Sequence, residues 1–131
     1  ALGWGLGCAV GTKLAWPNRP VVGLSGDGAA MYGIQALWTA AHHHIPAVFV
    51  IANNAQYKIL KVSGDVMQLP EMVRRNYLAM DLVDPEIDFV GLARSLGVQA
   101  RKIAEPDDLS EQLKDALKGT EPVLLDAIVD R

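Results

Sequence analysis

Residues 21–28 read VVGLSGDG, a short apolar run that ends in an aspartate between two glycines. The apolar residues predict a buried strand over 21–24, and the polar end marks a turn into the next element. Residues 47–52 (AVFVIA) form a second continuous apolar run, as expected of a strand buried on both faces, and this run ends in Asn53-Asn54. Between the two strands, apolar residues recur at helical spacing and predict one amphipathic helix: Met31, Ile34, Leu37, Trp38 and Ala41.

The rest of the chain continues the alternation of helix and strand. Residues 3–14 are small and apolar and suit a helix, and the downstream patterns predict helices over 89–96 and 107–118 and strands over 98–103 and 122–129. This order predicts an α/β fold, a doubly wound and mostly parallel sheet with helices on both faces. Ligands in such folds bind beyond the carboxyl ends of the strands, so Gly-Asp-Gly and Asn-Asn should lie along one rim.

Residues 56–88 break the alternation. They mix polar and apolar residues, and Gly64, Pro70 and Pro85 interrupt any regular pattern. A connection of this length between regular elements is usually functional or mobile, so we expect one of these two roles.

Length and composition set the class of protein. The 131 residues suffice for one domain over 1–131, half of them are apolar, and 21% are charged, as in ordinary globular proteins. The net charge of -3 without a basic run argues against nucleic acid as a partner. The apolar run around Pro46 is too short to span a membrane, and residues 1–9 lack the charged region of a signal peptide.

Two further features concern the origin of the chain. Cys8 is the only cysteine, so no internal disulfide can form, and a reducing, cytoplasmic location is expected. The sequence starts at Ala1-Leu2-Gly3 without a methionine, and we expect it to be a piece of a longer protein.

Asp27 is the residue whose placement points to chemistry. Its flanking glycines let the backbone approach a ligand closely, and the following helix start offers free N–H groups to a phosphate. The aspartate itself would repel a phosphate unless a cation lay between them. Magnesium prefers such hard oxygen ligands, and Asn54 offers an uncharged amide oxygen from the neighbouring strand.

Other phosphate motifs fit less well. Gly11-Thr12-Lys13 has the wrong order for a Walker motif, and the glycines over 3–11 lack the spacing of a dinucleotide fingerprint. Taken singly, Gly26-Asp27-Gly28 and Asn53-Asn54 are also compatible with simple turns.

The pair of motifs, separated by residues 29–52, resembles the signature of thiamine-diphosphate-dependent enzymes. The resemblance extends from Leu2 to Val129, over the cofactor diphosphate-binding domain of the decarboxylase and carboligase group. Within this group, three stretches are most similar to benzoylformate decarboxylases: residues 34–41 (IQALWTAA), 85–89 (PEIDF) and 97–100 (GVQA).

The resemblance implies roles for individual residues. Asp27 and the Asn54 side chain would bind Mg²⁺, with the backbone carbonyl of Gln56 as the third protein ligand. Gly28 and Ala29 would offer backbone N–H groups to the diphosphate, where relatives often carry a serine in place of the alanine. The remaining cofactor contacts implied by the resemblance are Gly26, Tyr57 and Leu2, the last as the apolar residue that holds the cofactor in its bent form. Ile59 and Leu60 fall where relatives line the substrate pocket, although both could equally be core residues of a short helix.

The resemblance also implies a function and partners. The cofactor would decarboxylate a 2-oxo acid, and the glutamate that activates it would come from the pyrimidine-binding domain of the same or a partner subunit in a homo-oligomer. No catalytic side chain is therefore expected within the chain, and the isolated chain should be inactive. Three alternatives remain open: a carboligase of the acetolactate synthase type, a non-catalytic cofactor-binding or assembly module, and a phosphate-binding regulatory domain.

Overall fold

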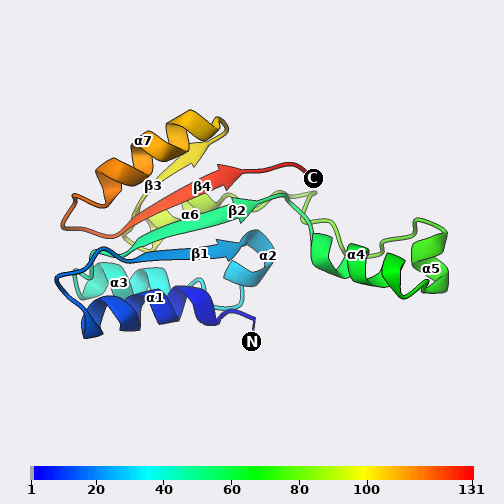
Figure 1. The fold of residues 1–131 in the computed structure, drawn as a ribbon, viewed down its shortest axis with the longest axis horizontal. Helices are drawn as coiled ribbons and strands as arrows, with labels where there is room; N and C mark the ends of the chain where they lie inside the picture. Colours follow the sequence, from blue (N-terminus) through cyan, green and yellow to red (C-terminus); the bar gives the residue numbers. More distant parts are fainter. Residues whose placement is uncertain (1) are drawn as a thin grey trace.

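The computed structural model describes residues 2–131 and contains one parallel sheet (Figure 1). Its strands are β1 (Val22–Gly26), β2 (Val48–Asn53), β3 (Gln99–Ile103) and β4 (Val123–Ile128), in the spatial order β1-β2-β4-β3. All three pairings are parallel, so the carboxyl ends of the four strands share one rim. The predicted fold class and the four predicted strands are confirmed.

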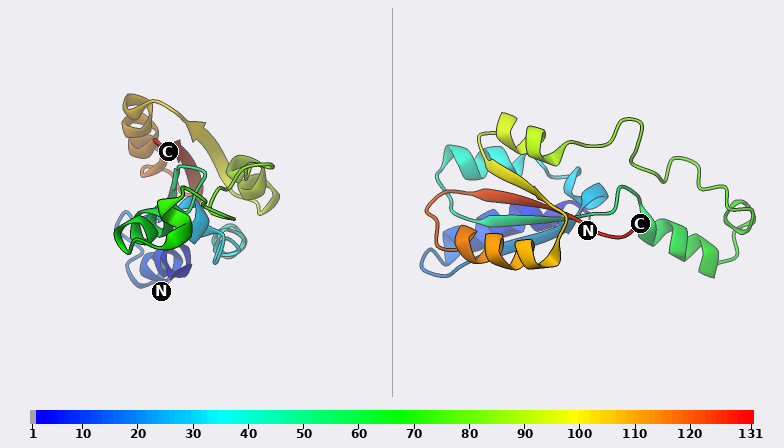
Figure 2. Two further views of the ribbon diagram at one scale, coloured as in Figure 1. Left: turned by 90° about the vertical axis from the view of Figure 1, so that its right-hand side faces the viewer. Right: turned by 90° about the horizontal axis from the view of Figure 1, so that it is seen from above.

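Helices cover both faces of the sheet, as Figures 1 and 2 show. One face carries α1 (Trp4–Ala15), α3 (Ala36–His42) and α6 (Phe89–Ser95), and the other carries α7 (Pro106–Ala116). Strand β2, one of the two inner strands, is buried on both sides because Phe49 and Ile51 pack under the first group while Val48 and Val50 pack under α7. The unbroken apolar run of its sequence reflects this position.

Local signals set the ends of several helices. Asp88 caps α6 by accepting a hydrogen bond from the Gly91 amide at 2.9 Å, and Gly97, with a φ of 83°, ends the helix in a left-handed conformation. Pro106 opens α7, and Asp107 in its first turn complements the helix dipole.

The single helix predicted over Met31 to Ala41 is wrong. The structure instead has a four-residue helix, α2 (Asp27–Ala30), then turns, then α3. The Gly33 amide donates to the Ala30 carbonyl at 3.0 Å, a tight turn that carries Gly33 against the backbone of Gly3. A side chain at Gly33 would overlap the Gly3 carbonyl oxygen, so this close approach and not the apolar spacing decides the local path.

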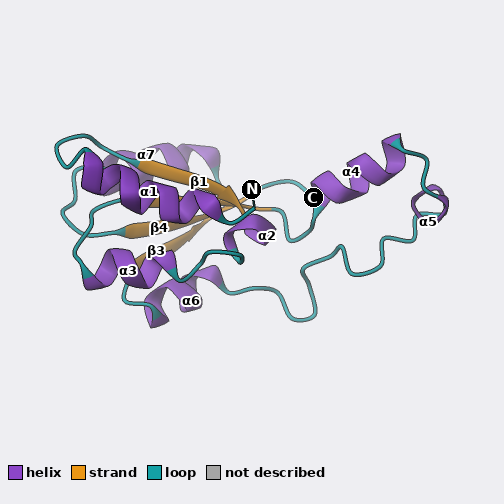
Figure 3. Ribbon diagram, turned by 90° about the horizontal axis from the view of Figure 1, so that it is seen from below, coloured by secondary structure: helices purple, strands orange, loops and turns teal. Residues whose placement is uncertain are grey.

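Residues 57–82 form an arm that extends beyond the carboxyl rim of the sheet (Figures 1 and 3). The arm contains α4 (Lys58–Val66) and α5 (Pro70–Val73), and it returns to the rim through an isolated antiparallel bridge between Gln56 and Asp81. No helix within residues 2–131 is long and apolar enough to cross a membrane.

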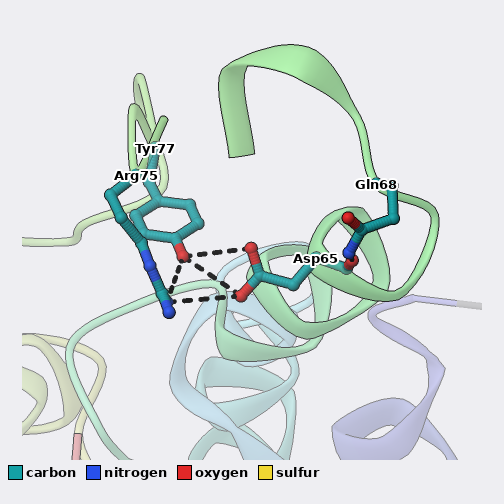
Figure 4. A network of polar contacts seen from close by, with 4 residues as sticks. All are labelled: Asp65, Gln68, Arg75 and Tyr77. Atoms are coloured by element: carbon teal, nitrogen blue, oxygen red, sulfur yellow. Dashed lines mark hydrogen bonds and ion pairs between the residues drawn. The ribbon is translucent and has the colours of Figure 1, made fainter. Parts of the chain in front are cut away.

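Polar contacts hold the outgoing and returning halves of the arm together (Figure 4). The Tyr77 hydroxyl donates to the Asp65 carboxylate at 3.1 Å, and Arg75 donates to the Tyr77 hydroxyl at 2.9 Å. Nearer the rim, Lys61 pairs with Asp81 at 2.8 Å. The segment expected to be functional or mobile is therefore a folded projection with its own contacts.

Candidate functional site

A cavity of about 530 Å³ opens at the carboxyl rim, between the ends of β1 and β2 and the base of the arm. Every residue that the sequence suggested for cofactor, metal or substrate lies in its lining: Leu2, Gly26, Asp27, Gly28, Ala29, Asn54, Gln56, Tyr57, Ile59 and Leu60. Residues from three separate parts of the sequence thus meet in one place, as the parallel topology requires.

Asp27 sits at the floor of this cavity with only 4% of its surface exposed. Gly26 is extended, and it directs the chain from β1 into the first residue of α2. One carboxylate oxygen, Oδ1, accepts a hydrogen bond from the Gly28 amide at 2.8 Å. The other, Oδ2, is buried and has no hydrogen-bond partner among residues 2–131. A buried carboxylate oxygen without a partner is costly, and a bound cation would remove that cost.

Asn54 and Gln56 supply two further oxygens from the turn after β2. The Asn54 side-chain oxygen accepts from the Gln56 amide at 3.1 Å, which leaves its second lone pair free. The adjoining bridge runs from the Tyr57 amide to the Met80 carbonyl and from the Leu82 amide to the Ala55 carbonyl, both at 2.8 Å. It therefore does not use the Gln56 carbonyl.

The donor set fits magnesium. It combines one carboxylate, one amide oxygen and one backbone carbonyl, which are hard oxygen ligands, and it leaves room for diphosphate oxygens and water. A site for a softer metal would need other residues, and no group of three His, Cys, Asp or Glu side chains gathers within the described part of the chain.

The backbone donors differ from the expectation at one residue. The Gly28 amide, expected to face the diphosphate, donates to Asp27 instead. The Ala29 amide lies in the first turn of α2 and lacks an intrahelical acceptor, so it stays available. Because α2 has four residues, its dipole contributes little, and an anion would be bound by the individual N–H groups.

Tyr57 explains why residue 28 is a glycine. Its ring lies directly against the Gly28 backbone, and a Cβ there would overlap Cε1 and lie 2.7 Å from Cδ1. Both residues line the cavity, so a displaced ring would change the shape of the cavity floor.

We predict that Gly28→Ala weakens binding of thiamine diphosphate about tenfold, because the new methyl group pushes the Tyr57 ring out of place. Isothermal titration calorimetry of the variant in magnesium buffer measures the effect. Adding Tyr57→Leu to Gly28→Ala removes the clash and should restore part of the affinity. Equal binding by Gly28→Ala and the unaltered chain would show that the ring contact has no consequence for the site.

Apolar side chains make up most of the cavity wall. Ile59 and Leu60, in the first turn of α4, are 70% and 51% exposed, so they are not core residues of a short helix. Leu2 is also exposed and lies just before α1. These side chains belong to a cavity wall that is mostly apolar, beside the few oxygens of the proposed metal site.

Sequence reasoning missed several lining residues: Tyr32, Ala52, Lys58, Leu78, Ala79, Met80 and Val129. Residues 78–80 reach the cavity because the arm folds back onto the rim, and no local pattern indicates that return. Ala52 could have been found from its place directly before Asn53-Asn54.

Asp126 is a second buried carboxylate close to the rim, which the sequence analysis did not single out. It is 2% exposed on β4 and accepts a hydrogen bond from the Asn53 side-chain amide at 3.0 Å. The pKa of Asp126 is raised above its ordinary value, mainly by burial. The hydrogen bond from Asn53 and the charge of Lys102 act in the opposite direction.

Comparison with known proteins gives the family. Residues 1–127 match the protein-family model described as "Thiamine pyrophosphate enzyme, C-terminal TPP binding domain", thiamine pyrophosphate being another name for thiamine diphosphate. The chain belongs to this family. Its thiamine-diphosphate-binding fold and its resemblance to benzoylformate decarboxylases are confirmed by the relatives described next.

Two curated relatives represent the two enzyme groups considered. The chain is 43% identical over 125 residues to benzoylformate decarboxylase of Pseudomonas aeruginosa, which covers 95% of the chain and 22% of that enzyme. It is 36% identical over 132 residues to the putative acetolactate synthase large subunit IlvX of Mycobacterium tuberculosis, covering 98% of the chain and 25% of that protein.

A solved structure agrees with the sequence comparison. The thiamine diphosphate-dependent 4-hydroxybenzoylformate decarboxylase of Rhodococcus jostii RHA1 superposes with a TM-score of 0.89 at 40% identity, over 98% of this chain and 23% of that one. The chain thus spans about a quarter or less of the length of these relatives.

Proposed function

We propose that residues 1–131 form one domain of a longer thiamine-diphosphate-dependent enzyme that decarboxylates a 2-oxo acid, a carboxy-lyase. In this proposal Asp27, Asn54 and the Gln56 carbonyl hold Mg²⁺, which in turn holds the cofactor's diphosphate. The observation that carries the proposal is Asp27, a residue of the cavity lining whose buried Oδ2 has no hydrogen-bond partner among residues 2–131. The similarity to benzoylformate decarboxylase supports the choice of reaction.

The residues of this chain would bind and orient the cofactor. When bound, thiamine diphosphate supplies a carbon nucleophile and an electron sink for the loss of carbon dioxide. Asp27 would neutralise part of the magnesium charge, and the Ala29 amide would donate to a diphosphate oxygen. Leu2 would support the bent cofactor, and Ile59 and Leu60 would keep water from the substrate side of the cavity.

The activating glutamate would come from a pyrimidine-binding domain of the same or a partner subunit, within a homo-oligomer. Exposed apolar side chains on α1, on the edge strand β1 and on the arm support such partners. One example from each is Trp4 on α1, which is 63% exposed, Leu24 on β1 at 69%, and Leu78 on the arm at 83%. We keep the cytoplasm as the proposed compartment, since Cys8 can form no internal disulfide.

The second candidate is a carboligase of the acetolactate synthase type. It rests on the similarity to the acetolactate synthase large subunits, at 36% identity for the M. tuberculosis protein. The non-catalytic alternative is a stand-alone cofactor-binding module. Such a module would have the same cavity but would catalyse no reaction.

Calorimetric titration of thiamine diphosphate into the chain tests the binding part of the proposal. Heat should appear with Mg²⁺ and vanish with a chelator, because the diphosphate and the Asp27 carboxylate repel each other without a cation. Binding of equal strength in chelator would exclude a metal-mediated clamp.

Exchange of domains between enzymes tests the reaction. The chain would replace the matching segment in the P. aeruginosa benzoylformate decarboxylase and, separately, the matching segment in the M. tuberculosis IlvX protein. The proposal expects benzoylformate decarboxylation by the first hybrid and no acetolactate formation by the second. The opposite pattern would favour the carboligase, and two folded, cofactor-binding but inactive hybrids would favour the non-catalytic module.

A further inference from the structure

The carboxylate of Asp126 has no place in the clamp described above, although it is nearly as inaccessible as a core leucine. Its exposed fraction is 2%, and it lies near the carboxyl end of β4. Side chains alternate along a strand, so Asp126 faces the same side as Leu124, under α1, α3 and α6. A buried acid in this position needs a polar partner.

Asn53, at the end of the neighbouring strand β2, is that partner, and both ends of its amide are engaged. Its Nδ2 donates to Asp126 Oδ1 at 3.0 Å, and its Oδ1 accepts from the Ala55 amide at 3.1 Å. Its backbone carbonyl accepts from the Val129 amide at 3.0 Å, which ties the same residue to the segment after β4. Contacts with β4 and with the segment after it therefore hold both the side chain and the backbone of Asn53 in place.

The turn that follows is a strained one for its sequence. Ala55 has a φ of 53°, a left-handed conformation that alanine adopts at a cost. The hydrogen bond from its amide to Asn53 Oδ1 and the bond from the Gln56 amide to Asn54 Oδ1 hold this conformation. This conformation of Ala55 determines how the Asn54 side chain and the Gln56 carbonyl are oriented.

The same residues also adjoin Asp27. Asp27, Asn53 and Ala55 share the walls of a small cavity of about 10 Å³, a space for no more than about one water molecule. Because so little free volume lies between them, a shift of the turn after β2 would bring it against Asp27, the third proposed metal ligand.

We propose that Asp126 is a positioning residue: through Asn53 it sets the conformation of residues 53–56 and thereby the metal ligands Asn54 and Gln56. The consequence for cofactor binding rests on the proposed function, whereas the effect on the turn does not. Two replacements separate the hydrogen bond of Asp126 from its charge. Asp126→Asn removes the charge but keeps an oxygen that can accept from Asn53, whereas Asp126→Ala removes both.

Hydrogen exchange of the metal-free chain tests the effect on the turn. The Ala55 amide should exchange at least about tenfold faster in Asp126→Ala and in Asn53→Ala, and at its original rate in Asp126→Asn. Val123→Ala, at the other end of β4, controls for general loss of packing and should leave this amide unchanged while lowering the unfolding temperature. Unchanged Ala55 exchange in Asp126→Ala would overturn the proposal, as would an equal rise in Val123→Ala.

Calorimetry of the same variants then tests the consequence for binding. In Mg²⁺ buffer the affinity for thiamine diphosphate should fall about tenfold in Asp126→Ala, recover in Asp126→Asn, and fall no further when Asn53→Ala is added to Asp126→Ala. Full affinity in Asp126→Ala would overturn the role of this residue in positioning the ligands. Absence of metal-dependent binding in the unaltered chain would instead count against the proposed metal clamp in the isolated chain, while the exchange result still decides the effect on the turn.

Discussion

Asp27→Ala should abolish magnesium-dependent binding of thiamine diphosphate, with an affinity at least about a hundredfold below that of the unaltered chain. The substitution removes the only carboxylate among the three proposed ligands, and with it the one negative charge that these three ligands would place against the cation. Loss of one partner of a buried charge pair typically costs about 3–5 kcal/mol, and each 1.4 kcal/mol corresponds to about tenfold in affinity. Calorimetric titration in Mg²⁺ buffer measures the loss.

The stability of Asp27→Ala should not follow its affinity. In the metal-free chain Asp27 Oδ2 is a buried oxygen that has no hydrogen-bond partner within residues 2–131, so its removal should leave the unfolding temperature unchanged or higher. Asp115→Ala is the matched control, because it removes an exposed carboxylate paired with Lys118 on the opposite side of the sheet from α1. Retained affinity in Asp27→Ala, or an equal loss in Asp115→Ala, would contradict the assignment.

Phe49→Ala should destabilise the chain by about 3–5 kcal/mol, a large part of the 5–15 kcal/mol typical of a domain. Phe49 is fully buried on the inner strand β2, and its ring packs under α1 beside Gly23. Removing the ring leaves a cavity where two layers of the fold meet, and neighbouring strands cannot close it. Urea denaturation followed by circular dichroism gives the change in the free energy of unfolding.

Phe49→Leu provides the comparison for size. It keeps an apolar side chain of intermediate volume and should cost clearly less than the alanine substitution. A loss below about 1 kcal/mol in Phe49→Ala would mean that β2 is not the centre of the core.

The strands could be predicted well from the sequence because buried strands consist mainly of apolar residues. Residues 47–52 are apolar without interruption since β2 meets helices on both faces. The helix expected over Met31 to Ala41 failed for a tertiary reason: Gly33 must pass close to Gly3, and a contact between residues so far apart leaves no trace in local spacing. The return of the arm to Gln56 was hidden for the same reason.

Within the site, the motifs predicted placement better than contacts. Asp27, Asn54 and Gln56 lie together as the parallel topology demands. The bond from the Gly28 amide to Asp27, and the link from Asp126 to Asn53, depend on side-chain rotamers that no spacing encodes. In the sequence, the one available signal for Asp126 was an aspartate within the otherwise apolar run 122–129.

The most direct test of the metal site is a crystal of the chain grown with thiamine diphosphate and Mn²⁺ in place of Mg²⁺, with anomalous scattering recorded near the manganese edge. A single strong anomalous peak should lie within coordination distance of Asp27 Oδ2, Asn54 Oδ1 and the Gln56 carbonyl oxygen, beside the diphosphate. Cofactor bound with the metal at other residues, or with no metal beside Asp27, would contradict the account.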